Sequence, residues 1–313
     1  MAELHLGELR GRLGPSALIL QVEPGEQSKT LANAGRLYDE LAAARIERDD
    51  LFVTFGGGVV GDLGGFVAAT WLRGIPFVQI PTTLEAAVDA SVGGKTGVNH
   101  PAGKNLIGAF HQPSAVIIDT DFLSTLPARD FAAGLGESVK HAVISGEEFL
   151  AWHERHAAEI LARDADVLSE LIARNCAVKA DIVSRDEREA GLRAVLNYGH
   201  TVGHALEHFL DYELRHGECV GLGMIAANEL SCRRGLLAVP VAERIRELLS
   251  CLGLPGHVPR RLDPKQVVAV CRMDKKARCG AVNFMLARGP GQIERVSDVA
   301  DAEIVAALAA IES

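Results

Sequence analysis

Residues 50–81 read DLFVTFGGGVVGDLGGFVAATWLRGIPFVQIP, and this stretch decides the fold class. An apolar run at 50–55 leads into a glycine-rich segment, a helical pattern follows at 66–74, and a second apolar run occupies 76–81. Short apolar runs are typical of strands buried on both faces, and strands that alternate with helices predict a mostly parallel sheet. Runs at 17–23 and 115–120 predict two more strands, and a helix is expected from its N-cap Ser28 to about Arg45.

The pattern changes near residues 120–128. The segments 128–144, 147–183, 201–210 and 217–235 all have helical periodicity. We therefore predict an α/β domain over residues 1–125 and a mostly α-helical domain over residues 126–313.

The composition and net charge of the chain exclude some classes of function. Of 313 residues, 48% are hydrophobic and 23% charged, as in ordinary soluble globular proteins. The net charge of −9 argues against a general nucleic-acid or anionic-membrane surface, and no apolar run reaches transmembrane length. The six cysteines are scattered without a CxxC pair, which indicates free thiols and predicts a cytoplasmic protein.

The glycines of residues 56–61 match GxGxxG between a strand and a helix, a setting in which backbone N–H groups cradle a pyrophosphate. A glycine-rich turn for close packing is the alternative. The next strand ends in Pro-Thr-Thr with no acidic residue at its tip, so a dinucleotide would bind in a variant of the ordinary pattern. Its expected polar contacts are Asp62, Thr82 and Thr83.

Several cations stand out in this acidic chain. The segment SVGGKTGVNHPAGKN (91–105) places two lysines among turn-forming Gly and Pro, which a solvated loop would explain alone. Further cations are Arg73, Lys140, Lys179 and Arg193. Together they suit a small, multiply charged anion such as a phosphorylated sugar acid.

Four histidines lie in LNYGHTVGHALEHFLDYELRHGEC (196–219), namely His200, His204, His208 and His216. Neutral imidazoles are good zinc ligands, and a catalytic zinc usually has three protein ligands. Either His200 with His216 or His200 with His204 could share an ion, with Glu137 as a carboxylate ligand; Cys219 is a weaker candidate. Spacing alone does not choose among them.

Five ordered motifs together closely resemble the 3-dehydroquinate synthase family, from about residue 24 to the C-terminus. They are GGGVVGDLGGFVAATWLRGIPFVQIPTTL, VDASVGGKTGVNHPAGKNLIGAFHQP, GLGESVKHAVI, LNYGHTVGHALE and HGECVGLGM. The resemblance implies a Rossmann-like NAD-binding domain over 1–125 and a helical metal- and substrate-binding domain over 126–313. It also implies a homodimer with no nucleic-acid or membrane partner.

The activity implied is that of a lyase in chorismate biosynthesis. The substrate 3-deoxy-D-arabino-heptulosonate 7-phosphate (DAHP) would yield 3-dehydroquinate and phosphate by transient oxidation with NAD, phosphate elimination, re-reduction and intramolecular aldol closure.

The resemblance also implies roles for residues at matching positions. The ligands of Zn²⁺, or of Co²⁺ as an alternative, match Glu137, His200 and His216. Catalytic positions match Lys140, His204, Asn197 and Lys104. Substrate-binding positions match Arg73 (reaching across the dimer), Lys95, Asn105, Lys179, Arg193, Lys275 and Lys276. NAD contacts match Glu26, Lys29, Gly57, Gly58, Val59, Val60, Gly61, Asp62, Thr82, Thr83, Asp89, Lys95, Lys104, Phe122 and Thr125.

Departures from the family keep alternatives open. The family has a further N-terminal portion with an acidic contact to the adenosine ribose, and we expect this chain to start inside it, with an exposed sheet edge and weaker NAD binding. Glu85 replaces a usual apolar residue, and His141 stands where an aromatic residue is common. The rivals are an amino-dehydroquinate synthase or another secondary-metabolic sugar-phosphate cyclase, a metal-dependent polyol dehydrogenase, and an inactive NAD- and metal-binding relic.

Overall fold

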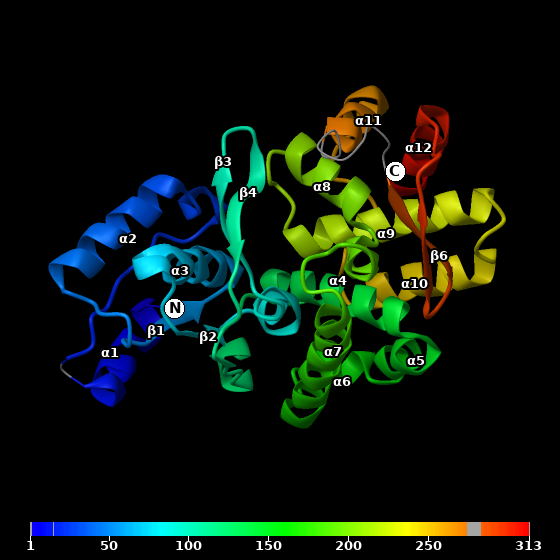
Figure 1. Cartoon of the computed structure of the whole chain (residues 1–313). Helices are drawn as coiled ribbons and strands as arrows, with labels where there is room; N and C mark the ends of the chain where they lie inside the picture. Colours follow the sequence, from blue (N-terminus) through cyan, green and yellow to red (C-terminus); the bar gives the residue numbers. More distant parts are fainter. Residues whose placement is uncertain (1, 15, 274–282, 313) are drawn as a thin grey trace. The chain divides into compact units, whose positions relative to one another are not determined.

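The computed structural model describes residues 2–14, 16–273 and 283–312 (Figure 1). The chain divides into two compact units, Met1–Thr125 and Leu126–Ser313. The first is an α/β unit and the second is mostly helical, so the predicted fold class is confirmed. No helix in the described part of the chain is both long and apolar enough to cross a membrane.

The N-terminal unit is built on a parallel sheet in the order β1 (Phe52–Gly56), β2 (Phe77–Pro81), β5 (Ala115–Val116). Phe52 of β1 pairs with Phe77 of β2. Helix α3 (Gly58–Thr70) connects these two strands, and α2 (Leu31–Ala43) packs on α3; α1 covers Ala2–Leu13. The core between α2 and α3 consists of Ala34, Leu37, Leu41, Leu63, Phe66, Val67 and Val98.

Three expected elements of this unit differ from the structure. Residues 17–23 form no strand: among the described strands none pairs with them, although Leu20 and Val22 pack against the core. The N-cap of helix α2 lies two residues later than expected, because Ser28 ends a 3-10 turn (Glu26–Ser28) and Thr30 is the N-cap, whose side chain accepts a hydrogen bond from the Asn33 N–H. The run at 115–120 forms only the short β5 before a 3-10 turn at Thr120–Leu123.

The lysine-bearing segment 91–105 is not a loop. It enters an antiparallel hairpin of β3 (Lys95–His100) and β4 (Gly103–Phe110), with Lys95 paired to Phe110. Gly97 lies opposite Gly108, where a Cβ on Gly108 would overlap the Thr96 carbonyl oxygen. The glycines that suggested a loop therefore allow two backbones to approach closely. A 3-10 turn (Trp71–Arg73) and a π-helical turn (Ala86–Ala90) complete the unit.

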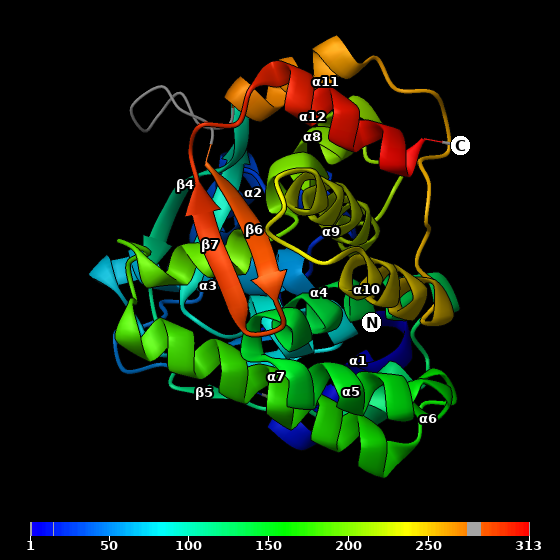
Figure 2. The ribbon, with the colours of Figure 1, turned by 90° about the vertical axis from the view of Figure 1, so that its right-hand side faces the viewer.

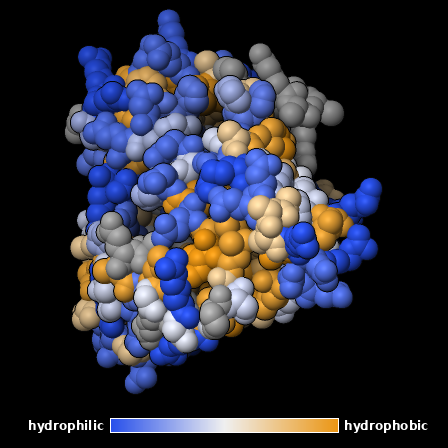
Figure 3. All heavy atoms as spheres, turned by 90° about the vertical axis from the view of Figure 1, so that its left-hand side faces the viewer, coloured by the Kyte–Doolittle hydropathy of each residue, from blue (hydrophilic) through white to orange (hydrophobic). Residues whose placement is uncertain are grey.

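Strand β1 lies at one end of the described strand order and leaves apolar side chains at the surface. Leu51 is 57% exposed and Val53 is 39% exposed. The face of the molecule in Figure 3 shows apolar area among hydrophilic side chains. The unit thus exposes apolar surface beside an edge strand, a place where further backbone pairing is available.

The C-terminal unit surrounds helix α9 (His216–Arg233), which is buried along most of its length. Helices α4 (Ala128–Ser145), α8 (His200–Phe209), α10 (Val239–Cys251) and α12 (Asp301–Leu308) pack on it. A hairpin of β6 (Phe284–Gly289) and β7 (Gln292–Val296), which the sequence did not predict, lies beside α9 (Figure 2). The other helical elements are α5 (Glu147–Arg155), α6 (Ala157–Leu161), α7 (Ala165–Arg185), α11 (Pro264–Met273) and 3-10 turns at Leu192–Asn197 and Ala309–Ile311.

Glycines bring α4, α8 and α9 unusually close. A Cβ on Gly217 of α9 would overlap the Ala133 carbonyl oxygen of α4, and one on Gly136 would overlap the Gly217 carbonyl oxygen. A Cβ on Gly223 would likewise overlap the Gly199 carbonyl oxygen, just before α8. These approaches decide how near a side chain of α4 comes to the first residues of α8 and α9.

Candidate metal centre

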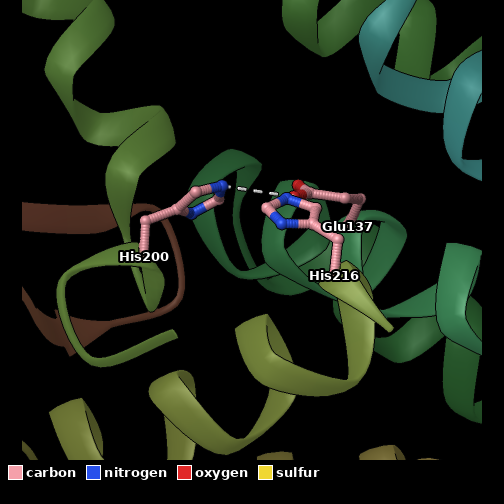
Figure 4. A group of neighbouring side chains, drawn as sticks. All are labelled: Glu137, His200 and His216. Carbon is pink, nitrogen blue, oxygen red and sulfur yellow. Dashed lines mark hydrogen bonds and ion pairs between the residues drawn. The ribbon is translucent and has the colours of Figure 1, made fainter. Parts of the chain in front are cut away.

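Three predicted ligands meet where these helices approach one another. Glu137 comes from the middle of α4, while His200 and His216 are the first residues of α8 and α9 (Figure 4). Glu137 Oε1 lies 3.3 Å from His200 Nε2 and 3.1 Å from His216 Nε2. One ligand atom from each residue lies within 4.8 Å of the other two.

Local structure fixes where both helices start. Gly199 has a left-handed φ of 81°, which favours glycine, and α8 begins at the next residue. At α9, Glu218 Oε2 accepts a hydrogen bond of 2.7 Å from the Arg215 N–H, and Arg129 of α4 donates to both Glu218 oxygens. The first residue of each helix therefore has a defined position.

The outer nitrogens of both imidazoles are already engaged. His200 Nδ1 lies 3.2 Å from the Tyr198 carbonyl oxygen, and His216 Nδ1 lies 3.1 Å from Glu207 Oε1. Both partners are acceptors, so a proton on Nδ1 of each neutral ring would leave a bare Nε2 toward Glu137 Oε1, the arrangement that a bound cation requires. Two nitrogen lone pairs and a carboxylate oxygen then face one another, an arrangement that a cation satisfies and that has the donor set of a zinc site.

The protonation states of Glu137 and His200 favour the binding of a cation. Burial alone raises the pKa of the Glu137 carboxyl, but the Lys140 ammonium and the two imidazoles outweigh burial and hold that pKa well below its usual range. Lys140 forms an ion pair with Glu137 Oε2, and both side chains are buried. Burial also lowers the pKa of His200 to about 4, against the opposing effect of Glu137. At neutral pH the cluster therefore presents a carboxylate and a neutral imidazole.

A second trio, His204, Glu207 and His216, overlaps the first. Glu207 was missed by sequence reasoning, and the available signal was its position three residues after His204 on the same helix. It is 3% exposed and holds His216 Nδ1, as carboxylates behind metal-bound histidines commonly do. Because this contact leaves Nε2 for the Glu137 side, we interpret Glu207 as the residue that orients His216.

The remaining histidines of the motif differ in environment. The ring centroid of His204 lies 5.1 Å from that of His200 and 6.0 Å from that of His216, so His204 borders the centre. His208 is exposed on α8. Cys219 is completely buried in α9 and belongs to none of the candidate metal groups among the described residues.

The other predicted substrate residues of this unit lie on α7 and on the segment before α8. Lys179 and Arg193 are 6% and 1% exposed. Arg193 Nη1 donates to the Glu187 carbonyl oxygen at 2.5 Å, and Asn197 donates to Glu189 Oε1 at 2.7 Å. Lys275 and Lys276 lie outside the described residues.

In the N-terminal unit, five predicted or neighbouring residues form one connected polar cluster. Lys29 Nζ lies 2.6 Å from Asp62 Oδ2 and 3.6 Å from Glu26 Oε1. Asn99 Nδ2 donates to Glu26 Oε1 at 2.8 Å, and the Asn105 N–H donates to Asn99 Oδ1 at 3.0 Å. Burial lowers the pKa of Lys29, but Asp62 and Glu26 outweigh burial and raise it. The cluster joins the start of α3 to the hairpin and to the turn before α2.

The glycine motif begins α3, so residues Gly58–Asp62 are already helical rather than a loop before a helix. A Cβ on Gly57 would lie 3.0 Å from Thr83 Cγ2, and one on Gly61 would lie 2.9 Å from Gln79 Oε1. Thr82 follows β2 and its N–H donates to the Gly56 carbonyl oxygen at 2.9 Å. These glycines therefore allow close packing, as the alternative interpretation predicts. The same segment begins helix α3, whose N-terminus favours anions.

Other predicted contacts are spread over this unit. Arg73 is exposed after α3 with a positive φ of 68°, and Lys95 is exposed at the start of β3. Lys104 is partly exposed near the start of β4, and Asp89 lies in the π-helical turn. The ring centroids of Phe122 and Phe55 are 5.1 Å apart, and Thr125 Oγ1 donates to the Phe122 carbonyl oxygen at 3.3 Å.

A buried histidine outside the metal centre gives a pH prediction. Burial lowers the pKa of His153 on α5 from 6.5 to about 4. Its folded-state pKa lies below the unfolded value, so its stabilisation is complete above pH 6.5 and is lost as the pH falls toward 4, by about 3 kcal/mol in all. Urea unfolding at several pH values should show a shallower acid loss in His153→Phe, whereas replacement of the exposed His208 should leave the loss unchanged. An equal acid loss in His153→Phe would contradict this.

Known proteins match this chain over most of its length. Residues 19–133 match the family model for the 3-dehydroquinate synthase N-terminal region, and residues 134–277 match that for its C-terminal region. The 3-dehydroquinate synthase of Geobacter metallireducens is 50% identical over 92% of this chain and 81% of its own length. That of Desulforamulus reducens is 47% identical over 94% of this chain and 82% of its own length.

Solved structures extend the likeness to related cyclases. The 2-epi-5-epi-valiolone synthase of Streptomyces hygroscopicus subsp. jinggangensis, solved with NAD⁺ and Zn²⁺, has a TM-score of 0.91 and 30% identity, covering 99% of this chain and 88% of that one. A 2-deoxy-scyllo-inosose synthase with carbaglucose-6-phosphate, NAD⁺ and Co²⁺ has a TM-score of 0.89 and 28% identity, covering 98% and 86%. A probable glycerol dehydrogenase of Sinorhizobium meliloti, 18% identical with a TM-score of 0.66 over 99% and 88%, shares the fold alone. With both family regions matched and identities of this size, the chain belongs to the 3-dehydroquinate synthase family.

Proposed function

We propose that this chain is an NAD- and divalent-metal-dependent lyase that converts DAHP into 3-dehydroquinate and phosphate. Family membership supports the reaction, and the Glu137–His200–His216 cluster is the observation that carries the metal dependence. Its carboxylate and two imidazoles are three ligands, the number that leaves an open position for a substrate oxygen.

The cofactors proposed are NAD in the N-terminal unit and Zn²⁺ or Co²⁺ in the C-terminal unit. When bound, the metal supplies a Lewis acid and NAD supplies a hydride acceptor. The proposed NAD contacts include the Glu26–Lys29–Asp62 cluster, the residues that begin α3 and the threonines after β2. Two cyclases of similar structure were solved with NAD⁺ and one of these metals, which supports this assignment.

Charged side chains around the metal centre hold its proposed ligands in place. Lys140 stabilises the ionised form of Glu137, and Glu207 fixes the ring of His216. For the substrate, we assign the phosphate to Lys95, Asn105 and Arg73, the last from the partner of a homodimer. We assign the substrate carboxylate to Lys179 and Arg193, the ring hydroxyls to Lys140, Asn197 and Lys104, and a place beside the reacting carbons to His204. Arg193 is buried and donates to the Glu187 carbonyl oxygen, which suits a positioning group.

We propose DAHP rather than the substrate of a related cyclase because the sequence of this chain is more similar to 3-dehydroquinate synthases than to those cyclases. Relatives named 3-dehydroquinate synthase are 45–50% identical to this chain, whereas the two cyclases of similar structure are 28% and 30% identical. The homodimer and a cytoplasmic location stay predictions.

The test is phosphate release from DAHP by the full chain with NAD and zinc, before and after a chelator. We expect release that the chelator abolishes, with formation of 3-dehydroquinate and no accumulation of NADH. Accumulating NADH would point instead to a dehydrogenase. No release from folded, zinc-loaded protein would refute the proposal.

A further inference from the structure

Asn99 lies at an irregularity in the hairpin of β3 and β4 (Figure 1). The ladder shifts register at this point, so that residues 104–106 of β4 face Asn99 alone. Bulges of this kind are common beside functional sites, where they redirect side chains. This one carries Lys104 and Asn105, two of the residues that the proposed function assigns to the substrate.

Three hydrogen bonds join Asn99 to other segments of the unit. Its Nδ2 donates to Glu26 Oε1 at 2.8 Å, and its Oδ1 accepts from the Asn105 N–H at 3.0 Å. Its backbone N–H donates to the Lys29 carbonyl oxygen at 2.8 Å. The two side-chain partners fix the orientation of the Asn99 amide, because the reversed amide would turn its oxygen toward a carboxylate and its NH₂ toward an N–H.

The bond to Asn105 restrains an unusual backbone conformation. Asn105 has a φ of 53°, in the left-handed region that few residues other than glycine adopt. Asparagine tolerates this region, and the bond from its N–H to Asn99 Oδ1 stabilises it further. Asn105 is exposed, so we infer that the direction of its side chain depends on this hydrogen bond more than on packing.

The bond to Glu26 restrains a side chain that is only partly covered. The Glu26 side chain is 32% exposed, and its Oε1 lies 3.6 Å from Lys29 Nζ, which itself lies closer to Asp62 Oδ2, at 2.6 Å. The Asn99 amide therefore makes the shorter of these two contacts with Glu26 Oε1. Without it, the longer contact with Lys29 would have to hold the carboxylate.

We propose that Asn99 is a positioning residue that serves the proposed NAD site and the proposed phosphate site at once. Its Nδ2 directs the Glu26 carboxylate, and its Oδ1 fixes the backbone of Asn105. Asn99 is not among the positions that the family resemblance assigns to either ligand. The inference rests on the proposed function, which supplies both ligands. A residue that only stabilised the hairpin would change stability and leave both affinities as they are.

The first measurement is the NADH affinity of the full chain, by fluorescence titration without substrate. We expect Asn99→Ala to weaken binding about tenfold, the size that follows from losing a hydrogen bond to a charged group. In a Glu26→Ala background the same substitution should have almost no effect, because its influence on NADH passes through Glu26. An equal loss in both backgrounds would overturn the proposal.

The second measurement is the affinity for inorganic phosphate, by calorimetry with NAD at saturation. We expect Asn99→Ala to weaken phosphate binding about fivefold, the size of one neutral hydrogen bond. The loss should be equal with and without Glu26→Ala, because the contact with Asn105 does not involve Glu26. Unchanged phosphate affinity in Asn99→Ala would overturn the proposal.

Thr96→Val is the matched control for both measurements. Thr96 is 6% exposed, and its hydroxyl donates to the Ala109 carbonyl oxygen at 2.9 Å within the same hairpin. Valine keeps the shape of the side chain but removes this hydrogen bond, so stability should fall while both affinities stay at the wild-type values. Affinity losses as large as those of Asn99→Ala would show that hairpin stability alone sets them, and would overturn the positioning role.

Hydrogen–deuterium exchange without ligands separates this inference from the proposed function. Asn99→Ala should speed exchange at the Asn105 N–H, which loses its acceptor. If the wild type binds no NADH, the proposed NAD site fails, and this exchange still decides whether Asn99 restrains Asn105. If the wild type binds NADH and phosphate but Asn99→Ala alters neither affinity, the positioning role alone is overturned.

A second variant covers the case in which Asn99→Ala does not fold. Asn99→Asp keeps an acceptor for the Asn105 N–H but turns a carboxylate oxygen toward Glu26 Oε1. The two carboxylates repel each other, so NADH affinity should fall further than in Asn99→Ala, although aspartate is closer in shape to asparagine. Wild-type NADH affinity in Asn99→Asp would overturn the proposal.

Discussion

His216→Ala is expected to abolish metal binding and to lower turnover of DAHP by about a thousandfold or more. The substitution removes one of three ligands and leaves Glu137 and His200 too few to hold an ion against water. A metal that polarises a substrate oxygen contributes several kcal/mol to the transition state, and each 1.4 kcal/mol is about tenfold in rate. Zinc content after dialysis and phosphate release would be measured on the same preparation.

His208→Ala is the matched control for this experiment. It removes an exposed histidine from the same short segment and should leave zinc content and turnover near wild type. If His216→Ala retained stoichiometric zinc, His216 would not be a ligand, and both this ligand set and the overlapping trio of His204, Glu207 and His216 would be wrong.

Gly217→Ala should destabilise the C-terminal unit by about 3 kcal/mol or more and weaken the metal centre with it. The new Cβ would overlap the carbonyl oxygen of Ala133, a backbone atom that no side-chain rotation can move. Overpacking of this kind costs about 1–3 kcal/mol and sometimes more, so Tm should fall by roughly 6–12 °C. Because α4 and α9 must separate, the distance between Glu137 and His216 should increase, and Co²⁺ affinity should fall.

Gly221→Ala, one turn further along α9, is the control. Its Cβ would meet the nearest atoms, on Leu254 and Leu249, at 3.5 and 3.7 Å, which is ordinary contact. Alanine also favours the helix by up to about 1 kcal/mol over glycine, so Tm should stay level or rise. Equal Tm values for the two variants would show that the α4–α9 approach relaxes at little cost.

The order of strands and helices could be predicted from the sequence because it follows from local hydrophobic patterns. The runs at 50–55 and 76–81 became β1 and β2, and the two-unit architecture followed from the change of periodicity. The run at 17–23 shows the limit of such reading. Its composition suits a strand, but a strand exists only where a neighbour supplies hydrogen bonds, and that is a property of the whole sheet.

The hairpin at 95–110 shows the same limit in the opposite direction. Its glycines and proline suggested a loop, because local propensity does not record that Gly97 and Gly108 face each other across a ladder. The start of α2 at Thr30 rather than Ser28 is a smaller case, since two residues with similar side chains both suit an N-cap.

The sequence by itself determined the α/β and helical architecture, the family resemblance and the choice of Glu137, His200 and His216 as candidate ligands. Those depend on residue types and their order. Only the tertiary structure decided that the three ligand atoms converge, that Glu207 holds His216, and which acceptor each ring nitrogen of His200 and His216 meets. These depend on which acceptor each nitrogen meets across helices far apart in the chain, and spacing along one helix holds no information about that.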